Sequence, residues 1–154
     1  MYRICLRYSN SYAEAEDIAQ EGFIKIFQNI HQCKNTEKIE YWMGKIMIHT
    51  ALEKLKKKSL LYIAEDVFDI EIQHNYEDVI GQLSAKEIIS IIQELSPQYK
   101  MVFNMYEIDG YSHTEISKIL GISEGTSRSN LLRAKAILQN KLLKYFPYTK
   151  EKNI

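Results

Sequence analysis

The pattern Ser-x-x-Glu constrains this fold more than any other feature, because it occurs three times and each copy precedes apolar residues at helical spacing. The copies begin at Ser11, Ser84 and Ser112. In such a capping box, the serine and the glutamate each satisfy a backbone donor that the start of a helix leaves free. The chain of 154 residues has only six Gly and two Pro, which suits long helices better than turn-rich β-architectures. We therefore predict an all-α fold.

The residues after Ser11 predict an amphipathic helix. Its apolar stripe, spaced by three and four residues, comprises Ala15, Ile18, Ala19, Gly22, Phe23, Ile26, Phe27 and Ile30. Gly22 costs a helix roughly 1 kcal/mol relative to Ala, so we expect another helix to pack closely there. The opposite face carries Asp17, Gln20, Glu21 and Ile24. An exposed isoleucine among polar residues favours a protein-binding surface, although a solvated acidic face is the alternative.

A second predicted helix begins at Asn35 or Thr36 and runs to the basic residues 56–58. It combines aromatic and basic side chains, namely Tyr41, Trp42, His49 and Lys54. Aromatic rings beside basic groups stack on unpaired bases and hold phosphates in proteins that bind single strands. Taken alone this pattern does not decide the matter, since Trp42 fits a core position equally well.

Two further helices are predicted before the third capping box. The first follows Ser84, with Ile88, Ile91, Ile92 and Leu95 at helical spacing. Ser96 and Pro97 then predict an N-cap and a proline in the first turn of the second. We expect its inward residues to be Tyr99, Val102, Phe103 and Tyr106, and Gly110 to end it.

The segment 112–142 predicts a helix-turn-helix. Ser112 begins a short helix that buries Ile116, Ile119 and Leu120, Gly121 supplies a left-handed residue, and Ser123 caps a long last helix. If that helix buries Leu131, Ala134 and Leu138, its outer side carries Arg128, Ser129, Leu132 and Arg133. The two arginines are suited to pair with guanine edges or with phosphates, and Gly125 and Thr126 are suited to bind phosphate. The alternative is an ordinary helical hairpin with a solvated basic face.

The net charge is zero, but the charges are unevenly distributed. Residues 59–85 contain no Lys or Arg, whereas Glu65, Asp66, Asp69, Glu71, Glu77 and Asp78 all occur there. From Lys118 onward, eight basic residues stand against two acidic ones, which agrees with nucleic-acid binding. We predict two small helical domains, 1–58 and 84–146, joined by a flexible acidic linker, 59–83, with a basic tail, 147–154. The second domain is a helix-turn-helix (winged-helix-like) bundle.

Several classes of protein are excluded by the same sequence. No apolar run approaches the ~20 residues of a membrane span, and no secretory signal is found, so we expect a cytoplasmic protein without membrane insertion. Cys5 and Cys33, with His31, fit no zinc spacing, and no metal ion is predicted. No nucleophile–base pair or phosphate loop occurs, so we expect neither catalytic residues nor a cofactor. The chain is therefore predicted not to be an enzyme.

The blocks taken together resemble the extracytoplasmic-function (ECF) group of the sigma-70 family of RNA polymerase sigma factors. The segment 13–27, preceded by Tyr8, resembles the part of region 2 that grips the β′ clamp helices of the polymerase. The segment 42–52 is similar to the part that melts and reads the −10 element. The segment 95–135 is similar to region 4, which reads −35 DNA and contacts the β flap. The three segments occur in the family's order.

The resemblance implies three binding surfaces. Residues at polymerase-binding positions are Asp17, Gln20, Glu21 and Ile24. Residues at −10 positions are Trp42, Lys45, His49, Thr50 and Lys54. Residues at −35 positions are Thr126, Arg128, Ser129, Leu132, Arg133 and Lys135. The implied partners are the RNA polymerase core and promoter DNA, and the family often has an anti-sigma factor as well.

Two departures from the family pattern stand out. The family commonly has Asn where this chain has His49, which changes the shape available to an extruded −10 base. Members also usually carry one more helix before the segment that begins at Met1, so we expect either a start placed too late or a shortened domain with uncovered apolar surface. We predict an alternative sigma factor that directs RNA polymerase to specific promoters. The alternatives are a stand-alone helix-turn-helix regulator and a truncated, inactive sigma relative.

Overall fold

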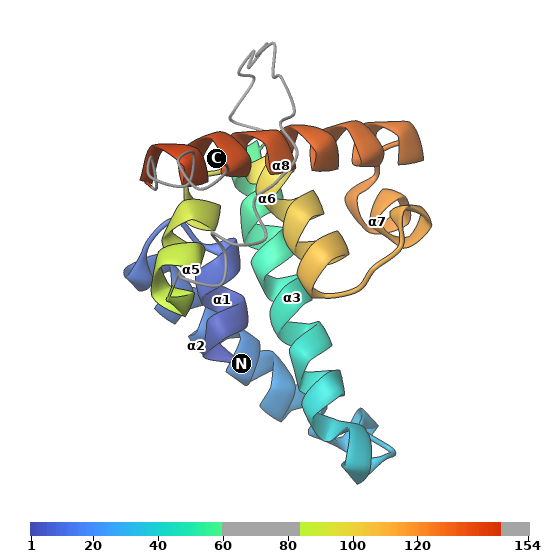
Figure 1. The fold of residues 1–154 in the computed structure, drawn as a ribbon. Helices are drawn as coiled ribbons and strands as arrows, with labels where there is room; N and C mark the ends of the chain where they lie inside the picture. Colours follow the sequence, from blue (N-terminus) through green and yellow to red (C-terminus); the bar gives the residue numbers. More distant parts are fainter. Residues whose placement is uncertain (60–83, 146–154) are drawn as a thin grey trace. The chain divides into compact units, whose positions relative to one another are not determined.

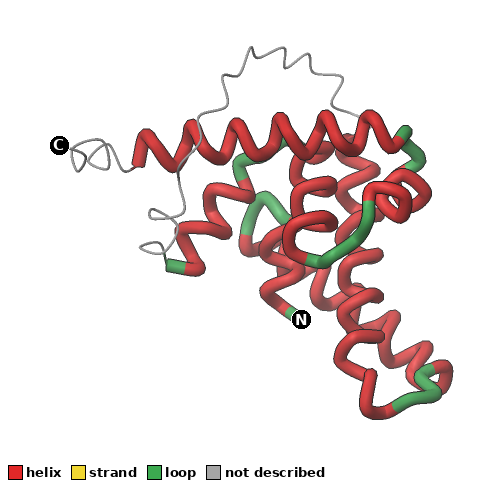
Figure 2. Tube along the Cα trace, turned by 45° about the vertical axis from the view of Figure 1, so that its right-hand side comes forward, coloured by secondary structure: helices red, strands yellow, loops and turns green. Residues whose placement is uncertain are grey.

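The structure, a computed structural model, describes residues 1–59 and 84–145, and every regular element there is a helix (Figures 1 and 2). The all-α prediction is therefore confirmed. The chain divides into two compact units, Met1–Ala64 and Glu65–Ile154, which are described separately. The predicted acidic linker, beyond Ser59, and the predicted basic tail lie outside the described residues. None of the described helices has the length and apolar character needed to span a membrane.

Within the described residues of the first unit, three helices pack against one another. They are α1 (Tyr2–Tyr8), α2 (Tyr12–Asn29) and α3 (Ile39–Ser59), and two short 3-10 turns, η1 (Ile30–Gln32) and η2 (Thr36–Lys38), lie between α2 and α3. Fully buried residues from all three helices form the core, including Cys5, Tyr8, Ala15, Ile18, Met47, Ala51 and Leu55. A Cβ at Gly22 would collide with Sδ of Met47, so the predicted close helix packing at this glycine is confirmed.

The start and the end of α2 both differ from the prediction. The Ser11 hydroxyl accepts from the amide of Glu14 at 3.2 Å, but the Glu14 carboxylate reaches one residue further back, to the amide of Asn10 at 2.8 Å. The predicted capping box is thus only half formed. At the other end, Phe23 and Phe27 are 37% and 74% exposed, and Ile30 is 44% exposed. The prediction that these three are buried is wrong, because the face of α2 covered by α1 and α3 is narrower than the apolar stripe.

The second unit is organised around α8 (Glu124–Tyr145), the last helix among its described residues. In Figure 1, α8 runs across α5 (Ala85–Gln93), α6 (Pro97–Phe103) and α7 (His113–Leu120), and it contacts all three. The hydrophobic core joins α5, α6 and α8 and consists of Ile91, Ile92, Leu95, Tyr99, Ala134 and Leu138. Both capping boxes of this unit are complete, with Ser84 paired to Glu87 and Ser112 to Glu115. Pro97 lies in the first turn of α6, as predicted.

A π-helical segment, η3 (Asn104–Ile108), follows α6 and was not predicted. The amide of Asp109 donates to the carbonyl of Asn104, five residues back, at 2.9 Å. The wider turn changes which side chains face the core. Tyr106 is therefore 39% exposed instead of inward, and its ring stacks on His113 with centroids 4.3 Å apart. The prediction of an inward Tyr106 is wrong for this reason.

Lys100 is fully buried, which is rare for a lysine. Its Nζ donates to the carbonyl of Gln93 at 2.7 Å. Gln93 is the last residue of α5, where carbonyls lack partners within the helix and the helix dipole favours a positive charge. Lys100 therefore ties the first turns of α6 to the end of α5.

We expect Lys100→Ala to lower the free energy of unfolding of the second unit by about 2–4 kcal/mol, because it removes buried side-chain contacts and a donor to Gln93. Urea unfolding of the full chain measures this loss. Lys86→Ala, at an exposed position of α5, removes the same charge and should change the unfolding midpoint very little. Equal losses in the two variants would contradict the structural role of Lys100.

Candidate nucleic-acid interface

The helix-turn-helix is built from local signals at each of its joints. Ser112 and Glu115 cap the start of α7, and the backbone at Gly121 is left-handed with φ 72°. The amides of Gly121 and Ile122 both donate to the carbonyl of Ser117, which closes the helix end. Ser123 then accepts from the amide of Thr126 at 3.0 Å and so caps α8. The predicted short helix, glycine turn and capped second helix are all confirmed.

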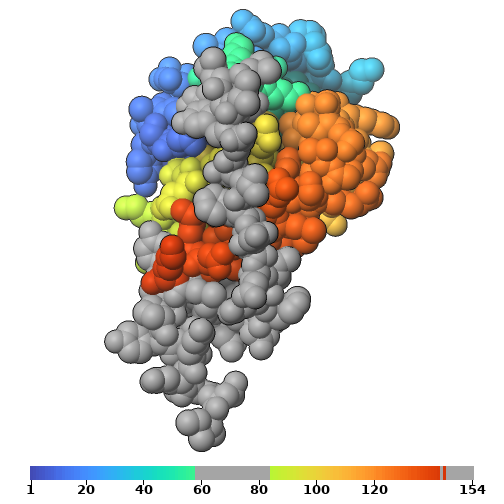
Figure 3. Space-filling model, turned by 90° about the horizontal axis from the view of Figure 1, so that it is seen from above, coloured from blue at the N-terminus to red at the C-terminus, as the bar shows by residue number. Residues whose placement is uncertain are grey.

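The burial of its side chains shows which face of α8 is exposed to solvent. Ile116 of α7 is fully buried, and Leu131, Ala134 and Leu138 of α8 are buried as predicted. The opposite side exposes four of the residues that the sequence analysis placed there, Arg128, Ser129, Leu132 and Arg133. Leu132 is 56% exposed on this face. In Figure 3, α7 and the first turns of α8 form one continuous surface area, drawn in orange.

Thr126 and Lys135 lie on the same helix but are already engaged. The Thr126 hydroxyl lies 2.9 Å from that of Ser123, within the N-terminal cap. The Lys135 ammonium pairs with Glu107 of η3 at 2.6 Å and is only partly exposed. By contrast, Arg133 is exposed and forms no ion pair with any residue that the structure describes. The cations of α8 therefore differ in how freely they can reach a ligand.

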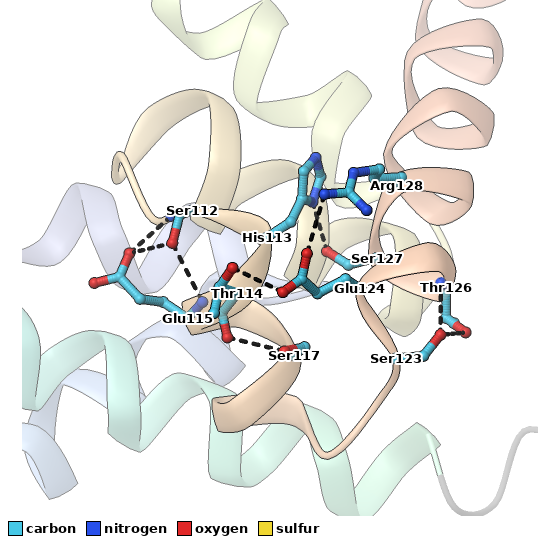
Figure 4. Close-up of polar contacts among 10 residues, drawn as sticks. All are labelled: Ser112, His113, Thr114, Glu115, Ser117, Ser123, Glu124, Thr126, Ser127 and Arg128. Carbon is cyan, nitrogen blue, oxygen red and sulfur yellow. Dashed lines mark hydrogen bonds and ion pairs between the residues drawn. The ribbon is translucent and has the colours of Figure 1, made fainter.

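A polar network links the two helices of the motif (Figure 4). Thr114 donates its hydroxyl to Oε1 of Glu124 at 2.8 Å, and Arg128 donates from Nη2 to Oε2 of the same carboxylate at 3.0 Å. Beside them, Nδ1 of His113 lies 2.8 Å from the Ser127 hydroxyl. The Thr114 hydrogen bond, followed by the Arg128 charge, lowers the pKa of Glu124, and burial followed by Arg128 lowers the pKa of His113. Near pH 7 the carboxylate is therefore charged and the imidazole neutral.

The aromatic and basic residues of α3 are only partly brought together. Tyr41, Lys45 and His49, each four residues apart, are exposed along the helix, and the Lys45 ammonium lies 4.6 Å from the centre of the Tyr41 ring. Trp42 is half-buried beside them. Thr50, however, is fully buried, and its hydroxyl donates to the carbonyl of Ile46 at 2.9 Å. The prediction that Thr50 contacts DNA is therefore corrected, because its side chain is turned into the domain.

The acidic face of α2 and the end of α3 share an ion-pair network. Lys25 contacts Glu21 at 3.3 Å and Glu53 at 2.7 Å, and Lys54 contacts Glu21 at 3.6 Å. Burial alone would lower the pKa of Lys25, but the hydrogen bonds to Glu53 and Glu21 outweigh it and raise that pKa. Glu21 and Lys54, assigned to different surfaces from the sequence, are thus neighbours. The other candidates on α2, which are Asp17, Gln20 and Ile24, are exposed.

Comparison with known families matches both units. The family model for sigma-70 region 2 matches residues 1–60, and the model for sigma-70 region 4 matches residues 85–138. Together they span most of the chain in the family's order. The chain belongs to the sigma-70 family, in its ECF group. The predicted family is therefore confirmed, and this sigma factor has the class of function that defines the family, promoter-specific and non-enzymatic transcription initiation.

Relatives of this sigma factor match over nearly its whole length. The ECF RNA polymerase sigma factor SigW of Bacillus subtilis is 29% identical, over 92% of this chain and 82% of the relative. SigM of the same organism is 26% identical, over 90% of this chain and 86% of its own length. Among solved structures, RpoE of Bartonella quintana, in complex with the anti-sigma factor NepR, matches with a TM-score of 0.55 and 20% identity, over 93% of this chain and 89% of that chain. The last match supports the fold.

Sequence reasoning missed part of the sigma factor's helix-turn-helix surface. Glu124 and Arg128 are four residues apart, and this spacing alone predicts an ion pair on one helix face. The contribution of Thr114 had no such signal, because it reaches Glu124 from the other helix. The stacking of Tyr106 on His113 depends on the unpredicted π-helical segment. Contacts within one helix could thus be predicted from residue spacing, whereas contacts between helices could not.

Proposed function

We propose that this sigma factor brings core RNA polymerase to its promoters through two DNA contacts, one with duplex −35 DNA and one with unpaired −10 bases. One observation carries the proposal: α8 exposes a cationic face inside a fully capped helix-turn-helix, in the segment that matches region 4. In this scheme residues 1–58 act as region 2 and residues 84–146 as region 4. Residues 59–83 are the linker between them, and residues 147–154 form a basic tail.

The −35 contact is assigned to the N-terminal half of α8, which enters the major groove. Arg128 and Arg133 are both exposed on the outer face of α8, and a guanidinium pairs with two acceptors on a guanine edge or with a phosphate. Leu132 offers an apolar contact of the kind that a thymine methyl group accepts. Thr126 and Ser129 are exposed beside them but serve as weaker phosphate contacts, because their hydroxyls already pair with the Ser123 hydroxyl and the Thr126 carbonyl. Lys135 belongs to this set as a phosphate contact only, since its ammonium already pairs with Glu107.

The −10 contact is assigned to the exposed aromatic and basic edge of α3. Tyr41 and the half-buried Trp42 provide rings on which an unpaired base stacks, and Lys45 and His49 provide donors to its edge or to the backbone. Lys54 lies further along the helix, where Glu21 partly neutralises it, and serves as a weaker phosphate contact. Thr50 is left out of this set because its hydroxyl is used inside the helix.

The polymerase contact is assigned to the exposed face of α2, with Asp17, Gln20, Glu21 and Ile24 directed at the β′ clamp helices. An apolar side chain surrounded by carboxylates and an amide suits a partner surface that is basic with an apolar centre. Region 4 would contact the β flap. The protein then acts where RNA polymerase acts, in the cytoplasm. Each DNA contact raises the local concentration of the other, so two weak contacts give one stable complex.

In-vitro transcription with purified core polymerase and a promoter library tests the proposal. We expect transcripts to start at promoters that share one −35 and one −10 sequence, and the protein to co-purify with core polymerase. The alternative hypothesis, a stand-alone helix-turn-helix regulator, predicts instead that the protein binds a palindromic duplex as a dimer and has no affinity for polymerase. An anti-sigma factor, like the one bound to the RpoE relative, would reduce transcription in the same assay when added.

A further inference from the structure

We propose that Glu124 is a positioning residue: anchored by Thr114 of α7, it holds the guanidinium of Arg128 in the orientation that reads a base pair of the −35 element. The inference rests on the proposed function, because it concerns how the same face of α8 selects DNA. It assigns a role in base selectivity to two residues that need not touch DNA themselves. The geometry of Figure 4 carries the argument.

The carboxylate of Glu124 uses one oxygen for each neighbour. Oε1 accepts from the Thr114 hydroxyl at 2.8 Å, and Oε2 accepts from Nη2 of Arg128 at 3.0 Å. An ordinary ion pair between side chains one turn apart on a helix can change its orientation, because no residue outside that helix restrains it. Here the first turn of α7 supplies that restraint. The ion pair is therefore tied to the body of the helix-turn-helix.

The second link between the helices keeps this anchor in register. Ser127 is fully buried, and its hydroxyl lies 2.8 Å from Nδ1 of His113, whose ring stacks on Tyr106. His113 immediately precedes Thr114 on α7, and Ser127 lies within one turn of Glu124 on α8, so this part-buried contact sets the spacing across which Thr114 reaches Glu124. The Thr114–Glu124 and His113–Ser127 hydrogen bonds together hold α7 and α8 at a fixed spacing.

Arg128 stays available to DNA although it is paired. Its side chain is 59% exposed, and only one of its guanidinium nitrogens is committed to Glu124. A guanidinium has five N–H donors in a rigid fork, so fixing one edge fixes the direction of the other donors. A side chain that is already oriented loses less freedom on binding a particular base edge, and it adapts less well to a wrong one. Positioning therefore increases selectivity.

The same carboxylate works against unselective binding. Glu124 brings a negative charge to the DNA-facing end of α8, where it repels phosphates and cancels part of the Arg128 charge. Removal of the Glu124 charge is therefore expected to strengthen non-specific binding, whereas loss of the Arg128 positioning is expected to weaken base-specific binding. Non-specific affinity rises while the preference for one base falls, and a residue that merely supports the fold would change neither in this way.

The test uses the full chain with core polymerase, a promoter library randomised at the −35 element, and random-sequence duplex as the non-specific probe. We expect Glu124→Gln to reduce the preference at one base-pair position by roughly 5- to 10-fold, part of the discrimination that one bidentate contact supplies. It should also tighten binding to random duplex at low salt. Thr114→Val, which leaves all charges in place, should reduce the same preference without tightening non-specific binding.

Two controls separate positioning from general effects. Glu107→Gln removes the charge from another ion pair of α8, that with Lys135, and should leave base preference unchanged. In an Arg128→Lys background, Glu124→Gln should have no further effect on selectivity, because the two residues act through one contact. Thermal unfolding checks that each variant is folded.

The outcomes distinguish this inference from the proposed function. If the wild-type protein selects promoters but Glu124→Gln changes affinity equally for all sequences, the positioning role is refuted and the proposed function stands. If the wild-type protein selects no promoter with core polymerase, the proposed function itself is refuted, and the positioning role with it.

Discussion

Gly22→Leu is expected to destabilise the first unit by about 3 kcal/mol or more and to abolish transcription at temperatures where the wild type is active. Even a single Cβ at this position collides with Sδ of the fully buried Met47. Three further carbon atoms would have to displace the Met47 side chain from between α2 and α3 and push the helices apart, which overpacks a filled core. Circular dichroism during urea unfolding measures the loss.

Gly44→Ala is the matched control, because Gly44 lies in α3 of the same unit but its Cβ would meet Cδ1 of Ile4 at 3.8 Å, an ordinary contact. We expect it to be neutral or stabilising by up to about 1 kcal/mol, as Ala favours the helix over Gly. Met47→Ala combined with Gly22→Leu should recover part of the lost stability. A Gly22→Leu variant as stable as the wild type would mean that α2 and α3 are not in close contact.

The features that could be predicted from the sequence are those whose cause lies within a few residues. The capping box at Ser112 and the left-handed turn at Gly121 depend on local hydrogen bonds and on backbone freedom, so neighbouring residues specify them. Thr50 could have been included among these. A threonine inside a helix can donate to the carbonyl four residues back, and here the hydroxyl of Thr50 donates to the Ile46 carbonyl. Such an internal bond makes a DNA contact less favourable.

The errors arise where the packing of another element decides the outcome. Phe27 follows the apolar stripe of α2, yet it is exposed because the neighbouring helices cover a narrower face. Tyr106 turned outward because a π-helical segment altered the helical phase, and one extra residue in a turn has no distinct apolar pattern. For the candidate site, periodicity identified which residues of α8 face outward. It could not identify Thr114, whose role depends on the distance between two helices.

Removal of both arginines from the outer face of α8 should have the largest effect on DNA binding. Arg128→Ala and Arg133→Ala are each expected to weaken −35 binding by about 1–3 kcal/mol if the side chain reads a base. The two side chains share no partner among the described residues, so the double variant should lose roughly 2–6 kcal/mol. Transcription from the selected promoters, and binding of holoenzyme to −35 duplex at several salt concentrations, measure the loss.

The matched control is the double variant Lys86→Ala, Lys118→Ala, which removes two exposed positive charges of the second unit that lie outside α8. It should retain most of the promoter binding, since charge alone acts weakly at a distance in salt. Arg128→Lys and Arg133→Lys distinguish a phosphate contact from a bidentate base contact at each position. A phosphate contact survives Arg→Lys, whereas a bidentate base contact does not.

The salt dependence decides the role of each arginine. If Arg133 binds phosphate, Arg133→Ala should weaken binding equally for all sequences and lower the salt slope by about one. If Arg128 reads a base, Arg128→Ala should instead relax the preference at one position, because Glu124 already holds part of its charge. A folded double variant that still selects and transcribes the wild-type promoters would remove the outer face of α8 from promoter recognition. The sigma factor would then have to recognise the −35 element through another surface.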